Sequence, residues 1–118
     1  MGYVHAFIDV AAAMQQLERH IETFPGKLKQ ISSEDLLKRP APGKWSKQEI
    51  LGHLVDSAIN NLKRFTEIQF LPQPYSVISY RQNELVMVND YQNLSLDHLL
   101  DLWQALNRQV VLVAKRIP

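Results

Sequence analysis

Apolar residues recur every three or four positions along three long stretches of this chain, residues 7–24, 51–65 and 96–117. This spacing places the apolar side chains on one face of an α-helix. Helices with such faces pack against one another at shallow crossing angles and form bundles. The pattern therefore predicts an all-α fold. Because 118 residues is a usual length for one domain, we expect residues 1–118 to form a single helical-bundle domain.

Two of the three helices have clear signals at their N-termini. Ser46 and Glu49 have the spacing of a capping box, in which each side chain accepts a hydrogen bond from the backbone amide of the other residue. Ser95 is placed to cap the third helix, and Asp97 in its first turn matches the helix dipole. We therefore expect these two helices to begin directly after Ser46 and Ser95.

The helix ends and connections are set by prolines. We expect Pro25 and the glycine after it to stop the first helix, and Pro72 and Pro74 to end the second. A short helical turn is expected at residues 33–38. Residues 75–80 are rich in β-formers, but we interpret them as a loop followed by a short helix at 81–91, because the chain offers no partner strand.

Composition excludes several classes of protein. Thirteen Lys and Arg residues against twelve Asp and Glu residues leave no basic excess for nucleic-acid binding. The absence of cysteine excludes disulfides, thiolate nucleophiles and Cys-ligated metals. No apolar run approaches the roughly 18 residues that cross a bilayer, and the N-terminus lacks a secretion signal. We expect a cytoplasmic protein without nucleic-acid or membrane partners.

Three long helices with wide apolar faces are normally closed by a fourth. The apolar face at residues 110–117 has no evident partner in the sequence. Either the three helices and a short one suffice, or another chain covers the face, or the chain is a truncated form of a longer protein. We favour the last two interpretations.

The second helix carries the most informative polar residues. One side holds Ile50, Leu54, Ala58, Leu62 and Phe65, and the other holds Glu49, His53, Asp56, Ser57, Asn60 and Arg64. A solvated helix face is usually rich in Lys and Glu, whereas several residues here are poor helix formers. This composition favours a polar face selected for contacts, although a simply solvent-exposed His53 is the alternative.

The four histidines do not form a local metal motif. None of His5, His20, His53 and His98 lies one helical turn from another, so the H-x-x-x-H arrangement is absent. A metal site would need donors from different helices or from outside the chain. We expect His20 to be partly buried and His98 to be a surface or capping residue. Glycine-rich phosphate loops and G-x-S-x-G motifs are also absent.

Residues 40–58, Pro-Ala-Pro-Gly-Lys-Trp-Ser-Lys-Gln-Glu-Ile-Leu-Gly-His-Leu-Val-Asp-Ser-Ala, closely resemble the signature of the DinB/YfiT-like superfamily. There a W-S-x-x-E-x-x-x-H-L run opens the second helix. Residues 89–93 and 95–107 resemble one branch of the same family. The resemblance implies a four-helix bundle, commonly a homodimer, in which three histidines hold a divalent metal, nickel or zinc.

By this resemblance His53 is the first metal ligand, and the other two belong to an H-x-x-x-H on a final helix. The sequence contains no such motif, so the resemblance implies a bundle that is incomplete or truncated at the C-terminus. Helical spacing places Asp56, Ser57 and Asn60 where they would support the ligand or contact a substrate. Family members with known roles use low-molecular-weight thiols as cosubstrates.

Two functions follow. The first is a metal-dependent hydrolase or thiol S-transferase, since a three-histidine metal with an open position activates a bound thiol or water. The second is a non-catalytic helical module that self-associates or binds a partner through its unclosed apolar face. We favour the enzyme for the protein from which this chain derives.

Overall fold

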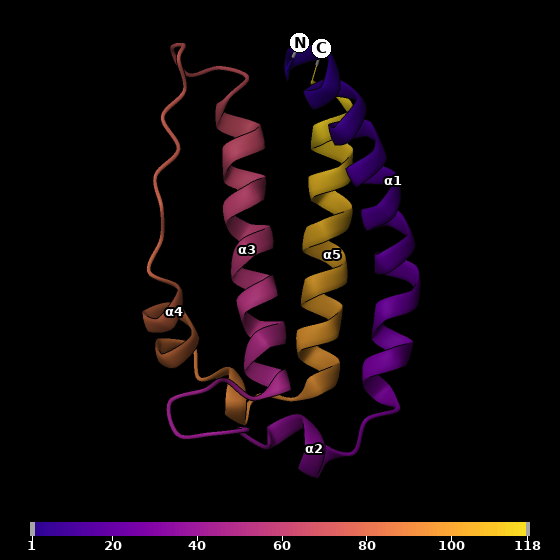
Figure 1. The fold of residues 1–118 in the computed structure, drawn as a ribbon, viewed down its shortest axis with the longest axis vertical. Helices are drawn as coiled ribbons and strands as arrows, with labels where there is room; N and C mark the ends of the chain where they lie inside the picture. Colours follow the sequence, from indigo (N-terminus) through magenta and orange to yellow (C-terminus); the bar gives the residue numbers. More distant parts are fainter. Residues whose placement is uncertain (1, 118) are drawn as a thin grey trace.

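A computed structural model describes residues 2–117, with side chains from residue 11 onward (Figure 1). These residues form α-helices and one short 3-10 helix, with no strand among them. The elements are α1 (Gly2–Lys29), α2 (Ser33–Leu37), α3 (Lys47–Glu67), α4 (Gln82–Val88), η1 (Tyr91–Asn93) and α5 (Leu96–Lys115). The all-α prediction is confirmed. None of the described helices combines the length and apolar content that crossing a bilayer requires.

The three long helices lie side by side, with α5 between α1 and α3 (Figure 1). Helix α5 contacts both neighbours and packs most extensively against α3. The Phe24 ring of α1 lies 5.1 Å from the Trp103 ring of α5, measured between centroids. The core consists of buried residues from all three helices, mainly Ile21, Leu28, Leu51, Val55, Leu99, Leu100 and Trp103. Because α5 supplies the central part of this core, it holds the other two helices in place.

Both predicted helix starts are confirmed. The Ser46 hydroxyl accepts a hydrogen bond from the Glu49 amide at 3.1 Å, and a Glu49 carboxylate oxygen accepts one from the Ser46 amide at 3.1 Å. The Ser95 hydroxyl accepts from the His98 amide at 3.0 Å in the same manner. Each cap satisfies backbone donors that have no partner inside the helix.

The predicted end of α1 at the Pro-Gly pair is wrong, because the helix continues through Pro25 to Lys29. Proline lacks the N–H that would donate to the Ile21 carbonyl one turn earlier. The Gln104 amide of α5 donates to that carbonyl instead, at 2.8 Å. The continued turn also buries Leu28 in the core. A tertiary hydrogen bond and apolar burial thus keep this turn helical.

The connection between α3 and α5 differs in detail from the prediction. Helix α3 ends at Glu67, before the two prolines. The single short helix expected at 81–91 is instead α4 and η1, separated by Asp90 in the left-handed conformation at φ 53°. Aspartate tolerates this conformation better than most residues. Residues 75–80 form no strand, as predicted, and run alongside α3 (Figure 1).

Burial on α3 departs from the expected division into an apolar and a polar side. Glu49 and Asp56, from the polar side, are buried, while Ile50 from the apolar side is 45% exposed. The buried face of α3 is rotated relative to the expected apolar side, because η1 and the residues before Ser46 cover part of the polar side. The prediction for His20 is also wrong, since this residue is exposed on α1, whereas His98 is exposed as expected.

Candidate functional site around His53

His53 lies in the second turn of α3 and is half-buried. Its imidazole packs against the Trp45 ring, with centroids 5.1 Å apart and planes inclined by 34°. The Nδ1 atom is buried and has no hydrogen-bond partner among the described residues. The capping box at Ser46 sets where α3 begins, and it thereby brings Trp45 against the imidazole about two turns later.

Asp56 follows His53 by one helical turn and is only 3% exposed. The Tyr91 hydroxyl donates a hydrogen bond to Oδ1 of Asp56, while Oδ2 has no partner among the described residues. Burial raises the pKa of Asp56 above its ordinary value, and the Tyr91 hydrogen bond and nearby His53 oppose that rise. The pKa of Tyr91 is raised by burial and by the adjacent carboxylate. Tyr91 is therefore a neutral donor at this position.

Tyr91 reaches Asp56 because α3 carries no side chain at Gly52. The Tyr91 ring lies directly over Gly52, where a Cβ atom would overlap it. The Gln48 amide donates to the Tyr91 carbonyl at 2.8 Å and to the Leu94 carbonyl at 2.7 Å. Residues of α3 thus contact both the Tyr91 ring of η1 and the backbone of η1 and the residue after it.

The other two predicted site residues are engaged within the chain. Ser57 and Tyr80 share a hydrogen bond between their hydroxyls at 2.9 Å. The Asn60 amide donates to the backbone carbonyl of Asp56 at 2.9 Å. Arg64 donates to the Ile78 carbonyl at 2.9 Å and lies 5.7 Å from the centre of the Tyr80 ring. The polar side of α3 therefore makes contacts, as its composition indicated, and many of them are with residues 78–91.

Sequence reasoning missed the partners of the buried acidic residues. Arg39 donates to both carboxylate oxygens of Glu49, at 2.9 Å and 3.2 Å. These hydrogen bonds lower the pKa of Glu49 although its burial opposes the shift. In the sequence, Tyr91 was placed only at the end of the short helix expected at 81–91. Its hydroxyl carried no signal in the sequence, because the hydrogen bond to Asp56 joins residues 35 positions apart.

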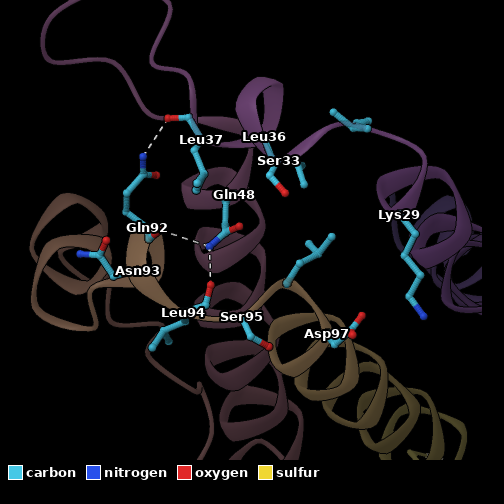
Figure 2. Close-up of a pocket in the computed structure, with 12 residues that line it drawn as sticks. Lys29, Ser33, Leu36, Leu37, Gln48, Gln92, Asn93, Leu94, Ser95 and Asp97 are labelled. Atoms are coloured by element: carbon cyan, nitrogen blue, oxygen red, sulfur yellow. Dashed lines mark hydrogen bonds between the residues drawn. The ribbon is translucent and has the colours of Figure 1, made fainter.

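Several clefts lie near the N-terminal end of α3, and η1 contributes to the lining of two of them. One, of about 590 Å³, is lined by residues of α2, η1 and the start of α5. Figure 2 shows the Gln48 side chain in this cleft, reaching the backbone of Gln92 and Leu94. The other, of about 480 Å³, includes Trp45, Glu49 and Val86 in its lining. Because Trp45 also packs on His53, the second cleft borders the candidate site.

The donors in the described part of the chain do not fit a complete metal site. No group of three or more His, Cys, Asp or Glu side chains there is placed to hold an ion. His20 and His98 are exposed on other helices, and the His5 side chain lies outside the described residues. Among the described side chains, His53 is the single imidazole at the candidate site.

The helical fold and the His53 motif agree with a comparison against protein families. The family model of the DinB superfamily matches residues 16–117. The chain belongs to the DinB superfamily. No curated protein and no solved structure matches it. The match includes α3, α4, η1 and α5, so every residue that builds the surroundings of His53 lies within the DinB region.

Proposed function

We propose that this DinB chain is part of a metal-dependent enzyme, a hydrolase or a transferase that uses a low-molecular-weight thiol. His53 would supply one ligand to a nickel or zinc ion, both of which imidazole suits. The supporting observation is the setting of His53 in the DinB region. Its ring is packed against Trp45 and lies one turn from the buried carboxylate of Asp56. Ordinary surface histidines have no such surroundings.

Since the described residues place one imidazole, that of His53, at the candidate site, the remaining metal donors would come from outside them. In the proposed homodimer a second copy would be one source of these donors. Ser57 and Asn60 are already hydrogen-bonded within the chain, so they act first as structural supports of α3 and the segment beside it. A substrate contact at Ser57 would require its hydrogen bond with Tyr80 to open.

Metal content measured by mass spectrometry tests the proposal. The purified chain, incubated with nickel or zinc and desalted, should retain metal. The retained metal should be lost in His53→Ala and kept in the matched variant His98→Ala, because His98 is exposed on another helix. A chain that retains no metal, or retains equal amounts with and without His53, contradicts the proposal.

A second function is favoured by exposed apolar residues on the long helices. Ile50 and Ile59 of α3 are 45% and 46% exposed, and Leu112 of α5 is 58% exposed. A non-catalytic module that associates with itself through such residues would bury them. Sedimentation velocity at micromolar concentration should then show a dimer. A folded monomer across that range contradicts self-association and also removes a second copy as the source of the missing metal donors.

A further inference from the structure

Two buried side-chain atoms on α3 lack hydrogen-bond partners among the described residues. They are Nδ1 of His53 and Oδ2 of Asp56. Buried polar atoms are almost always paired, because an unpaired one loses its hydration without compensation. These two unpaired atoms belong to residues only three positions apart on α3, so one interaction between them could satisfy both.

The two side chains are placed to interact. Residues three positions apart lie on neighbouring turns of one helix face, with Cβ atoms about 5–6 Å apart. Their chemistry is also complementary, because imidazole Nδ1 carries a hydrogen in one tautomer and a carboxylate oxygen only accepts. A direct contact would form by rotation of either side chain, and a water molecule would bridge a wider gap.

Neighbouring side chains orient both groups. The Tyr91 hydroxyl donates to Oδ1 of Asp56, which orients the carboxylate and leaves the lone pairs of Oδ2 available. The Trp45 ring packs on the imidazole and limits its rotation. Neither Tyr91 nor Trp45 makes a hydrogen bond to Nδ1 of His53 or to Oδ2 of Asp56. Each of these two unpaired atoms can therefore serve as the partner of the other.

We propose that Asp56 is a positioning residue, whose Oδ2 accepts a hydrogen bond from Nδ1–H of His53, directly or through one water. This bond holds His53 as a single tautomer with the lone pair of Nε2 free. A histidine ligand is commonly oriented by a carboxylate in this way. The role of this hydrogen bond rests on the proposed function, in which Nε2 of His53 is the nitrogen that would bind the metal. The tautomer itself does not depend on any metal.

Nuclear magnetic resonance of the ¹⁵N-labelled chain, without metal, tests the proposal directly. Long-range ¹H–¹⁵N spectra at about pH 8.5, some two units above the ordinary histidine pKa, distinguish protonated from unprotonated ring nitrogens. For His53 we expect a protonated Nδ1 and an unprotonated Nε2. The exposed His20 and His98 should show the averaged signals of a free imidazole in the same spectrum. His53→Gln assigns the resonance.

Asp56→Asn should reverse the tautomer. Its amide oxygen can still accept from Tyr91, and its amide nitrogen then donates to Nδ1, which moves the proton to Nε2. Asp97→Asn is the matched control, because it removes an exposed carboxylate on α5 and should leave the His53 signals unchanged.

The proposal is overturned if wild-type His53 shows the averaged signals of the exposed histidines or a protonated Nε2. It is equally overturned if a folded Asp56→Asn variant keeps the wild-type tautomer. The wild-type spectrum decides the matter even where the variant does not fold. Metal retention measured on the same samples separates the two proposals: a fixed Nδ1–H tautomer without metal binding refutes the function alone, and His53-dependent metal binding with averaged signals refutes the positioning alone.

Discussion

Asp56 shows how a single residue reconciles burial with polarity. A buried carboxylate loses its hydration, which raises its pKa, and only its hydrogen bonds compensate for that loss. Tyr91 supplies one of these hydrogen bonds from a different element. In the first turn of the same helix, Glu49 has two partners, Arg39 and the Ser46 amide, and its pKa is lowered. The pKa values of two carboxylates on one helix are therefore shifted in opposite directions.

Tyr91→Phe should lower the free energy of unfolding by about 1–3 kcal/mol, because it leaves Oδ1 of Asp56 buried without a donor. Urea unfolding at neutral pH measures the loss. Tyr80→Phe is the matched control, since it removes a hydroxyl that pairs with Ser57 in a half-buried position. Equal losses in the two variants would contradict the special role of the Tyr91 hydroxyl.

Glu49→Gln should reduce the loss of stability on acidification. A lowered pKa means that the Glu49 contribution is present above its ordinary value of 4.5 and is lost as the pH falls below it. Asp56, whose pKa is raised, contributes with the opposite sign. Unfolding free energies from about pH 6 to pH 3 should therefore fall less steeply in Glu49→Gln than in the wild type. The exposed Glu34→Gln should follow the wild-type slope, and a Glu49→Gln slope as steep as that would contradict the prediction.

At the scale of elements, the contact between α3 and η1 depends on close approach. The Tyr91 ring occupies the space over Gly52, and Gln48 fixes the η1 backbone from the same helix. This contact holds Tyr91 against Asp56 and therefore supports the surroundings of His53. Its formation requires a residue without a side chain at one position of α3.

Gly52→Ala should destabilise the protein by about 1–3 kcal/mol, because the new methyl group overlaps the Tyr91 ring. The better helix propensity of alanine, about 1 kcal/mol, offsets part of this loss. Gly26→Ala in α1 is the matched control, because no atom lies within 4 Å of the added Cβ. Thermal or urea unfolding should show that variant unchanged or stabilised. Stabilisation by both substitutions would refute the close contact.

Element boundaries were predictable where the signals are local. The caps at Ser46 and Ser95 involve residues three positions apart, so the sequence contains the complete hydrogen-bonding unit. The end of α1 was mispredicted because the bond that preserves its last turn comes from Gln104, 83 positions away. The left-handed Asp90 divides the predicted short helix in two, and Tyr91 directly after it is bonded to Asp56 of α3.

At the scale of the whole molecule, α5 is the central helix. Substituting one buried and one exposed leucine of α5 tests this arrangement. Leu100 is 1% exposed and Leu112 is 58% exposed. Leu100→Ala should lower the free energy of unfolding by about 2–5 kcal/mol. Leu112→Ala should change it by less than about 0.5 kcal/mol. A large, concentration-dependent effect of Leu112→Ala would instead show that a second copy covers this residue.

The helical class, the three long helices and the N-caps of two of them followed from residue spacing and short-range hydrogen bonding, which operate within a few positions of the chain. The family motif likewise singled out His53. The tertiary structure decided which side of α3 is buried, because Arg39 and Tyr91 satisfy its acidic residues across long separations. It also decided that Asp56 lies enclosed near His53 while Ser57 is bonded to Tyr80. Such pairings depend on which distant segments meet, and helical periodicity does not predict those tertiary contacts.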